Sequence, residues 1–577
     1  MHKPAELAPD IFDRTFWRFA ASLQQKQRTA TKVLALAVAI VIVFAGMMAA
    51  SPRILLSDYT YDFFIPLDGA LRSLNGQWPH LDFYTPVGDL YYVSLGLAAR
   101  IFGFTPKLVL WEQLIFLPFA LWATILATRD RLPASLRAIL ILMVGLLCIS
   151  PSDLDDSSSL SFLASYNRHG WVLMTPLVAA CLLEPLQHRK GRWITDAILL
   201  FLLALALFYL KMTFALVAIV TILLGIVLVP ANRRSCFVAG VLLAATLSVI
   251  WWSGPLMAAY FSDLHRTSLA SPISAQSYDP FRLVNLKTTL SSEWFALLAP
   301  LCFAVWLGRS SQTLEERRSG NRTLLVCMIA TGGSLGLAWQ NHEHAIPSQV
   351  VAMAIVFAAI WKRQMRREQA ATRPLLGSTD RPAVILAGLV LTFIAGCTVL
   401  NSGRGIVLHT VKTAFNLGQP ASTLSPILQG LTVPIDPTPG IIGDVLAGKI
   451  DPALYSVKSL TSWHNDIAGV LDDGYKLFEA NKPNTPRIVT LYSAPLMTVA
   501  TKTMPPRHMA AWMDYERTFG PRSPIMPEKD FSDANVVMVL KIYDHEKLFS
   551  MVSDYLHANF HIAGETPVWQ MWVRNGS

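Results

Sequence analysis

Residues 51–106 read SPRILLSDYTYDFFIPLDGALRSLNGQWPHLDFYTPVGDLYYVSLGLAARIFGFTP and directly follow the first long apolar run of the chain. Loops that only join two membrane helices rarely need many acids beside many aromatic rings. We therefore interpret this stretch as the catalytic loop of a membrane enzyme and the rest of the chain as its scaffold. The five carboxylates of the stretch are Asp58, Asp62, Asp68, Asp82 and Asp89.

The composition is that of a membrane protein with a water-exposed tail. The 577 residues are 53% hydrophobic and only 15% charged, with a mean hydropathy of +0.41. This balance is typical of polytopic membrane proteins. Apolar runs long enough to cross a bilayer recur up to residue 400 and then stop. We therefore predict a cytoplasmic segment at 1–32, a transmembrane domain at 33–400 and an outer domain at 401–577.

The basic residues set the predicted orientation. The net charge of +9 comes from short basic loops between apolar runs, as membrane topology requires, and does not indicate a nucleic-acid partner. The number of predicted spans depends on whether residues 87–103 cross the membrane. A full span there would move Arg129, Arg131 and Arg137 to the outside. We prefer a half-buried helix that returns to the outer face. The eleven predicted spans are 33–50, 107–127, 135–150, 170–186, 194–210, 212–229, 236–253, 293–308, 323–339, 347–361 and 382–400.

The sequence of the tail predicts a small α/β domain. The runs at 487–492 and 534–543 have the composition of strands, 544–560 that of a helix, and 567–574 that of a closing strand. It contains no cysteine, so no disulfide framework is expected there. With the N-terminus in the cytoplasm, this topology places the tail on the outer face of the membrane.

Two acids of the first outer loop are candidates for proton transfer. Asp58 and Asp62 are four residues apart, so a helix would put them on one face. A carboxylate beside apolar rings has a raised proton affinity, which suits a general base that acts on a hydroxyl. The alternative for each is a helix cap or a solvated loop acid.

The loop resembles the first outer loop of the GT-C glycosyltransferases, whose members include bacterial lipid A aminoarabinose transferases and protein O-mannosyltransferases. In that family an aspartate of this loop is the catalytic base or lies beside it. The resemblance implies Asp62 for this role, 14 residues before Gly76, with Asp58 as the alternative. Phe63 follows Asp62 where the family often has a second acid. The residues that carry the resemblance are Gly76, Pro79, Asp82, Phe83, Pro86, Gly88, Phe102 and Gly103.

An outward-facing enzyme of this type needs a donor that has crossed the membrane, and a polyprenyl-phosphate sugar fits. Its phosphate requires positive charge near the membrane surface. Lys211 stands between two apolar runs in LFYLKMTFAL (207–216), and the resemblance extends to this lysine turn. Lysines within apolar sequence usually have a specific partner, although snorkelling to the headgroups is the alternative. Arg168 and His169 of SYNRHGW (165–171) are expected to contact the phosphate or the sugar.

Further residues are expected to line the substrate pocket. Asp82 and Tyr84 belong to the first loop, and His342, Glu343 and His344 stand in WQNHEHAIP (339–347) between two spans. The last three also contain metal-ligand types, but their spacing is a weak signal. We therefore expect no cofactor and keep a divalent metal as the lesser alternative.

Together these features predict an inner-membrane glycosyltransferase that moves a sugar from a polyprenyl-phosphate donor to a hydroxyl of a glycan, lipid or protein at the periplasmic face, with inversion. The alternatives are a transporter or flippase of lipid-linked saccharides, a ligase or polymerase that uses a diphosphate-linked donor, and a non-catalytic assembly or sensor protein. A transporter would call for charged or broken helices at mid-membrane, whereas these acids lie in loops.

Overall fold

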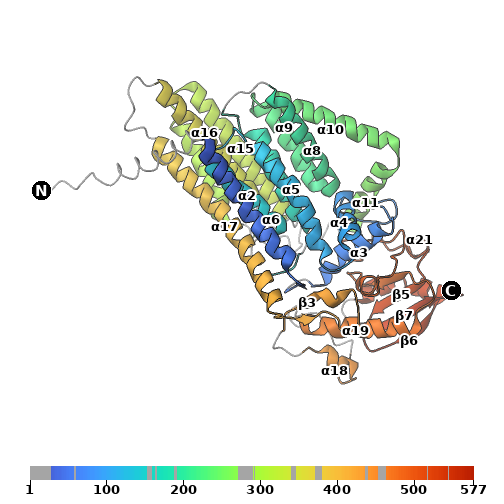
Figure 1. The fold of residues 1–577 in the computed structure, drawn as a ribbon. Helices are drawn as coiled ribbons and strands as arrows, with labels where there is room; N and C mark the ends of the chain where they lie inside the picture. The colour runs from blue at the N-terminus through green and yellow to red at the C-terminus, as the bar shows by residue number, and fades with distance from the viewer. Residues whose placement is uncertain are drawn as a thin grey trace.

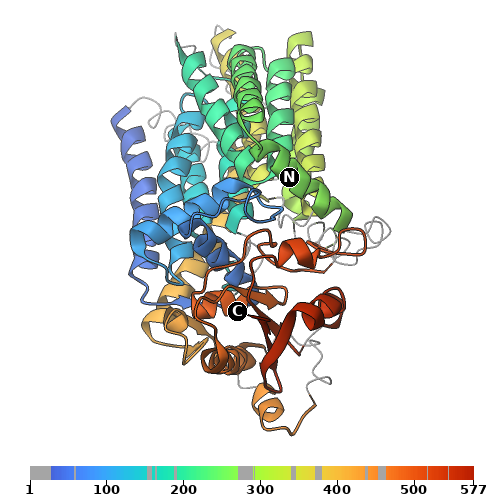
Figure 2. The same cartoon turned by 90° about the vertical axis from the view of Figure 1, so that its right-hand side faces the viewer.

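The chain forms a helical bundle with an α/β domain at one end (Figures 1 and 2). This confirms the predicted fold class. The structure is a computed structural model. It describes residues 27–57, 60–152, 159–162, 165–186, 191–270, 287, 290, 293–339, 346–370, 380–435, 440–451, 463–515, 517–542 and 545–576.

A helix coincides with each of the eleven predicted spans. By length and composition, α2, α5, α8, α10 and α17 are able to cross a membrane, and α6, α9 and α14 are shorter apolar helices. The last helix continues unbroken to Ala414, well beyond the predicted end of the span. The eleven helices are α2 (Gln27–Ala50), α5 (Leu108–Thr128), α6 (Ala134–Ile149), α7 (Ser165–Leu182), α8 (Arg192–Leu210), α9 (Met212–Leu228), α10 (Arg233–Ser253), α14 (Trp294–Arg309), α15 (Leu314–Trp339), α16 (Ile346–Ala370) and α17 (Asp380–Ala414).

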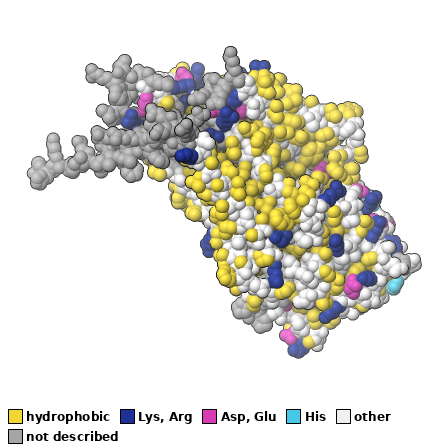
Figure 3. Space-filling model, in the orientation of Figure 1, with side chains coloured by type: hydrophobic (Ala, Val, Ile, Leu, Met, Phe, Trp, Pro, Cys, Tyr) yellow, Lys and Arg dark blue, Asp and Glu magenta, His cyan; other side chains and the backbone are white. Residues whose placement is uncertain are grey.

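The flank of the bundle is apolar, as a lipid-facing surface requires. Figure 3 shows hydrophobic side chains spread over this flank, and large ones such as Ile42 of α2 and Phe393 of α17 are about 60% exposed. Leaving such side chains in water would be unfavourable by roughly 25 cal/mol per Å², so this surface fits a bilayer. The multi-pass membrane location predicted from the sequence therefore agrees with the outer surface of the fold.

Between the bundle and the tail lie short helices of the first outer loop: η1 (Thr60–Phe63), α3 (Phe64–Leu74) and α4 (Asp89–Phe102). At a rise of about 1.5 Å per residue, the 14 residues of α4 span roughly 21 Å, which is short of the roughly 30 Å hydrocarbon core. This length agrees with a half-buried helix. Helix α11 (Leu256–Ala270) also lies beside α3 and α4 at this end (Figure 1).

The tail joins the first outer loop through a small sheet. Strand β1 (Ile54–Leu55) follows α2 and pairs in parallel with β3 (Leu431–Val433), which pairs antiparallel with β2 (Gln419–Pro420). The loop and the tail are therefore on the same side of the bundle, as predicted.

A second sheet forms the core of the tail, with strand order β4-β5-β7-β6. Strands β4 (Ile488–Leu491) and β5 (Val536–Leu540) are parallel, and β7 (Trp569–Arg574) is antiparallel to both β5 and β6 (Phe560–Glu565). The strands β4, β5 and β7 were predicted and β6 was not. The described helices of the tail are η2 (Leu428–Gly430), α18 (Ile442–Leu446), α19 (Trp463–Asn481), α20 (Leu496–Thr501), α21 (Pro527–Asp530), α22 (His545–Ser550) and α23 (Ser553–Asn559).

Candidate active site at the outer end of the bundle

The first outer loop is fastened to the tail by a buried cation. Arg72 of α3 donates from Nε to Asp68 Oδ2 at 2.6 Å and from Nη1 to the carbonyl of Pro506 at 2.8 Å. Gln77 Nε2 donates to the carbonyl of Pro505 at 2.6 Å. Because these bonds are buried and link segments over 400 residues apart in the chain, they make the loop and the tail one structural unit at this site.

Asp62 lies in η1 and faces the tail. Its side chain is partly buried, and burial raises its pKa from 3.8 to about 7. Of the neighbouring charges, Arg517 lowers this pKa and Asp514 raises it. Phe63, the next residue, packs edge-on against Phe162 of the second outer loop, with ring centroids 6.1 Å apart. A carboxyl with a pKa near neutrality is suited to accept a proton from a hydroxyl.

Several predicted site residues lie outside the described part of the chain. Asp58, the alternative base, lies outside the described residues. The same holds for His342, Glu343 and His344. In the part of the chain that the structure describes, no group of three or more His, Cys, Asp or Glu side chains is arranged to hold a metal ion.

Lys211 occupies the single-residue turn between α8 and α9. Its extended backbone (φ −166°, ψ 130°) ends one helix and begins the next. Its Nζ donates to Asn167 Oδ1 at 3.0 Å and lies 5.0 Å from the centre of the Tyr166 ring. The lysine therefore has specific side-chain partners on α7.

Arg168 and His169 follow on the same first turn of α7 and are both buried. They face Glu112 of α5, which interacts electrostatically with Arg168 and has Oε1 3.5 Å from His169 Nδ1. Ser94 of α4 donates to the same Glu112 oxygen at 2.8 Å. Ionisable side chains inside a membrane bundle are costly and are usually kept for function.

Glu112 was not among the site residues predicted from the sequence, although its position within an apolar run indicates a special role. It is the single acid inside an otherwise apolar run, LVLWEQLIFLPFALWATILAT. The neighbouring Gln113 is also fully buried, and both ends of its amide lack a hydrogen-bond partner among the described residues. Two adjacent polar residues of this helix are therefore buried inside the bundle, and Glu112 lies beside Arg168 and His169 of α7.

An apolar cavity of about 300 Å³ lies just below these cations. Its lining begins at Trp171 on α7 and Leu216 on α9, about one helical turn beyond Arg168 and Lys211. It continues between α7, α9, α15 and α16 as far as Leu182. The cavity is therefore apolar along α7 and α9 and ends about one helical turn from the two cations, which are not among its lining residues.

Asp82 and Tyr84 lie against the tail. Asp82 Oδ2 accepts a hydrogen bond from the backbone N–H of Trp78 at 2.7 Å, and Arg507 Nε lies 3.7 Å from Asp82 Oδ1. Tyr84 is buried, and its hydroxyl is 2.8 Å from Thr267 Oγ1 on α11. In this structure both side chains therefore help to dock the loop on α11 and the tail.

Asp89, at the first turn of α4, is a second carboxyl that the site hypothesis did not use. It is buried, and among the described residues neither of its oxygens accepts a hydrogen bond. Burial raises its pKa to about 6, while His80 lowers it. His80 Nδ1 is itself 2.7 Å from Asp263 Oδ2 on α11.

The start of α4 is held against the lysine turn by close backbone contact. The N–H of Gly88 donates to the carbonyl of Leu210 at 3.0 Å, and a Cβ at Gly88 would come 2.2 Å from the carbonyl oxygen of Tyr209. Only glycine allows this approach. The contact fixes the first outer loop beside Lys211.

The structure gathers the predicted residues into two groups at one end of the bundle. Lys211, which contacts Asn167 and Tyr166, and Arg168, which is beside Glu112, both lie at the first turn of α7. Asp62 instead lies beside Arg517 and Asp514 of the tail. Tyr91 of α4 also packs on the first turn of α7: its hydroxyl accepts from Ser165 Oγ at 3.0 Å, and its ring centroid is 5.3 Å from that of Tyr166.

The comparisons with known proteins find structural similarity only. No protein-family model matches the chain, and no curated protein matches it in sequence. The fold is similar to that of ArnT from Cupriavidus metallidurans. The crystal structure of ArnT bound to undecaprenyl phosphate matches with a TM-score of 0.45 and 12% identity, and the match covers 95% of this chain and 99% of that one.

The apo state of the same ArnT also has a TM-score of 0.45, with 12% identity over 94% of this chain and 98% of that chain. The Archaeoglobus fulgidus oligosaccharyltransferase tethered to an acceptor peptide matches with a TM-score of 0.38 and 11% identity, over 89% of this chain and 69% of that chain.

Proposed function

We propose that this protein is a membrane glycosyltransferase that moves one sugar from a polyprenyl-phosphate donor to an acceptor hydroxyl at the face of the membrane that carries the tail. The observation that supports this most directly is the position of two cations, Lys211 and Arg168, about one helical turn from an apolar cavity of about 300 Å³. A lipid phosphate needs both elements, a charged anchor for its head and a groove for its chain.

In this proposal each residue has a defined role. Lys211 and Arg168 hold the donor phosphate and stabilise the negative charge that grows on it as the sugar leaves. Glu112 keeps Arg168 and His169 in place from the opposite side. Asp62 accepts the proton of the acceptor hydroxyl, and attack from the face opposite the phosphate inverts the anomeric centre.

The position of Asp62 also indicates where the acceptor would bind. Asp62 faces Arg517 and Asp514 of the tail, so the acceptor would bind where the loop and the tail meet. Glycans, lipids and proteins all offer hydroxyls, and the geometry of the described residues does not favour one of them. The reaction needs no cofactor in this scheme, because the phosphate is already a good leaving group.

The direct test is binding of the donor lipid. Purified protein would be titrated with polyprenyl phosphate and followed by native mass spectrometry. Lys211→Gln removes one charge-assisted hydrogen bond of about 1.5–3 kcal/mol, so we expect roughly 10- to 150-fold weaker binding. Lys107→Gln is the matched control, because Lys107 lies at the start of another helix and donates to the Ala49 carbonyl instead.

Equal binding by wild type and Lys211→Gln would contradict the proposed donor site. Weak binding by Lys107→Gln would instead indicate a general effect of surface charge. Transfer itself would be measured with radiolabelled sugar on the polyprenyl phosphate in proteoliposomes, and accumulation of intact lipid-linked saccharide on the other side would favour a flippase.

A further inference from the structure

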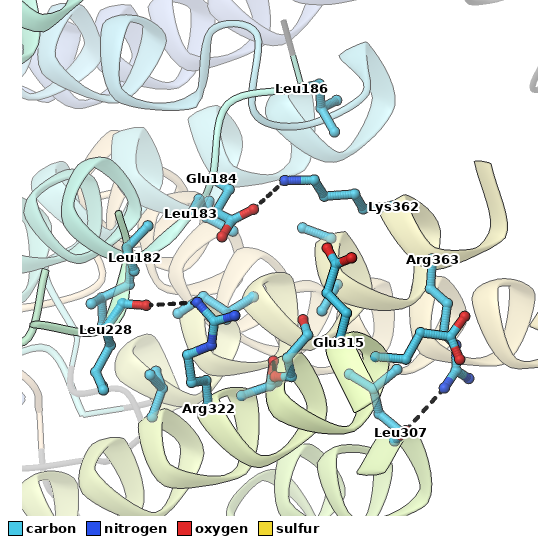
Figure 4. A pocket seen from close by; sticks show the side chains of 18 of the residues that line it. Leu182, Leu183, Glu184, Leu186, Leu228, Leu307, Glu315, Arg322, Lys362 and Arg363 are labelled. Atoms are coloured by element: carbon cyan, nitrogen blue, oxygen red, sulfur yellow. Dashed lines mark hydrogen bonds and ion pairs between the residues drawn. The ribbon is translucent and has the colours of Figure 1, made fainter. Parts of the chain in front are cut away.

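A second cavity lies at the other end of the bundle, away from the tail. Its volume is about 130 Å³, and it opens between the ends of α7, α9, α14, α15 and α16. Figure 4 shows the charged side chains around it, which come from the end of α7, from α15 and from α16. By the distribution of basic loops, this end is the cytoplasmic one. The sugar-transfer proposal does not use this cavity.

Charges of both signs surround the opening. Four cations line the cavity, Arg322, Lys362, Arg363 and Arg366, together with three carboxylates, Glu184, Glu315 and Glu316. Lys362 pairs with Glu184 across the cavity, and Arg366 Nη1 lies 2.7 Å from Glu315 Oε1. The near balance of charges distinguishes this opening from a purely basic anion site.

Arg322 differs from the other cations of the cavity. Lys362, Arg363 and Arg366 each pair with a carboxylate. Within the described residues, Arg322 reaches only the backbone carbonyls of Arg318 and Leu228, each at the long distance of 3.4 Å. Its guanidinium therefore retains strong donors that face the cavity, and a guanidinium binds phosphate oxygens in a bidentate manner.

The cavity also has an apolar continuation. Leu182 and Val326 line both this cavity and the apolar cavity of about 300 Å³ that leads toward the outer end. The cavity of about 300 Å³ is assigned to the donor chain, and apolar residues such as Leu186 and Ile355 line the second cavity itself. A charged opening with an apolar wall suits a lipid headgroup at the membrane surface. A soluble anion has no apolar surface to bury against these residues.

We propose that this cavity binds the headgroup of a glycerophospholipid with a primary amine, from the leaflet opposite the tail. The lipid phosphate lies against Arg322, and the ammonium lies between Glu184 and Glu315. A phosphatidylglycerol headgroup fits less well, because it carries no cation to pair with these carboxylates. A choline headgroup fits less well because it has no N–H to donate to them.

The test is lipid binding to the full-length protein in detergent, measured by native mass spectrometry with phosphatidylethanolamine, phosphatidylcholine and phosphatidylglycerol. We expect phosphatidylethanolamine to bind about tenfold more tightly than the other two, the effect of one or two charge-assisted hydrogen bonds. Arg322→Gln should remove most of that binding. Arg317→Gln is the matched control, because Arg317 lies on the same helix but is exposed and does not line the cavity.

A photoactivatable phosphatidylethanolamine provides a second measurement on the wild-type protein. The label should map to residues such as Ser319 and Leu228 that line the cavity. Equal binding by Arg322→Gln and wild type, equal binding of phosphatidylglycerol, or labels elsewhere on the bundle would each overturn the proposal. None of these readouts depends on sugar transfer, so a failure here leaves the proposed function untouched.

Discussion

The pKa of Asp62 leads to a prediction about the pH dependence of transfer. Burial raises this pKa to about 7, and a general base works only when it is ionised. About a tenth of the protein has Asp62 ionised at pH 6 and about nine tenths at pH 8, so kcat/KM should rise roughly tenfold over that range. An aspartate with its usual pKa of 3.8 would be ionised throughout and would give a flat profile.

The two charged neighbours of Asp62 make the prediction specific. Arg517 lowers the pKa and Asp514 raises it. The variant Arg517→Gln should therefore shift the midpoint of the profile to higher pH, and Asp514→Asn should shift it to lower pH. The assay is the initial rate of sugar release from polyprenyl phosphate between pH 5 and 9, with Asp62→Asn as the inactive reference.

A flat wild-type profile between pH 6 and 8 would refute the assignment of Asp62 as the base. The same conclusion follows if both charge variants move the midpoint in one direction, because a general change in folding and not electrostatics would then explain the data. Full activity in Asp62→Asn would remove the mechanism altogether.

Three further predictions follow from buried contacts. Glu112→Gln removes the carboxylate that faces Arg168 and His169, so KM for the donor should rise more than kcat falls; a loss in kcat alone would contradict this positioning role. Arg131→Met removes the guanidinium 2.8 Å from buried Asp196 and leaves that carboxylate with Arg192 at 3.3 Å, so stability should fall by about 1.5–3 kcal/mol, seen as a lower Tm; an unchanged Tm would contradict this. Tyr84→Phe loses the bond to Thr267, and unfolding should become easier by about 0.5–1.5 kcal/mol; an unchanged Tm would argue that this contact does not hold the loop.

The helices could be predicted because each is encoded locally. An apolar run of about 20 residues has no alternative to a helix in lipid, where every backbone polar group must be bonded within the segment. The apolar run at α4 could be distinguished from a full span, because a crossing there would have placed the basic loops that follow on the outer face. The strands β4, β5 and β7 were visible as dense apolar runs.

The predictions failed where the local pattern was ambiguous. Strand β6 (FHIAGE) contains few β-branched residues and has a register irregularity between Ile562 and Gly564, and the helix predicted there ran on to residue 560. The structure divides that segment into α22, α23 and the start of β6. Pairing with β7, and not local propensity, makes the segment a strand.

The sequence by itself determined the membrane class, the positions of the helices, the shared side of the first outer loop and the tail, and the identity of Asp62, Lys211 and Arg168 as candidates. Only the tertiary structure decided which groups meet. The approach of Glu112 to His169, of Asn167 to Lys211 and of Arg517 to Asp62 joins residues from 44 to hundreds of positions apart. Charge and pKa depend on distances of a few ångströms and on the loss of water, and neither is encoded in the spacing of residues along a chain.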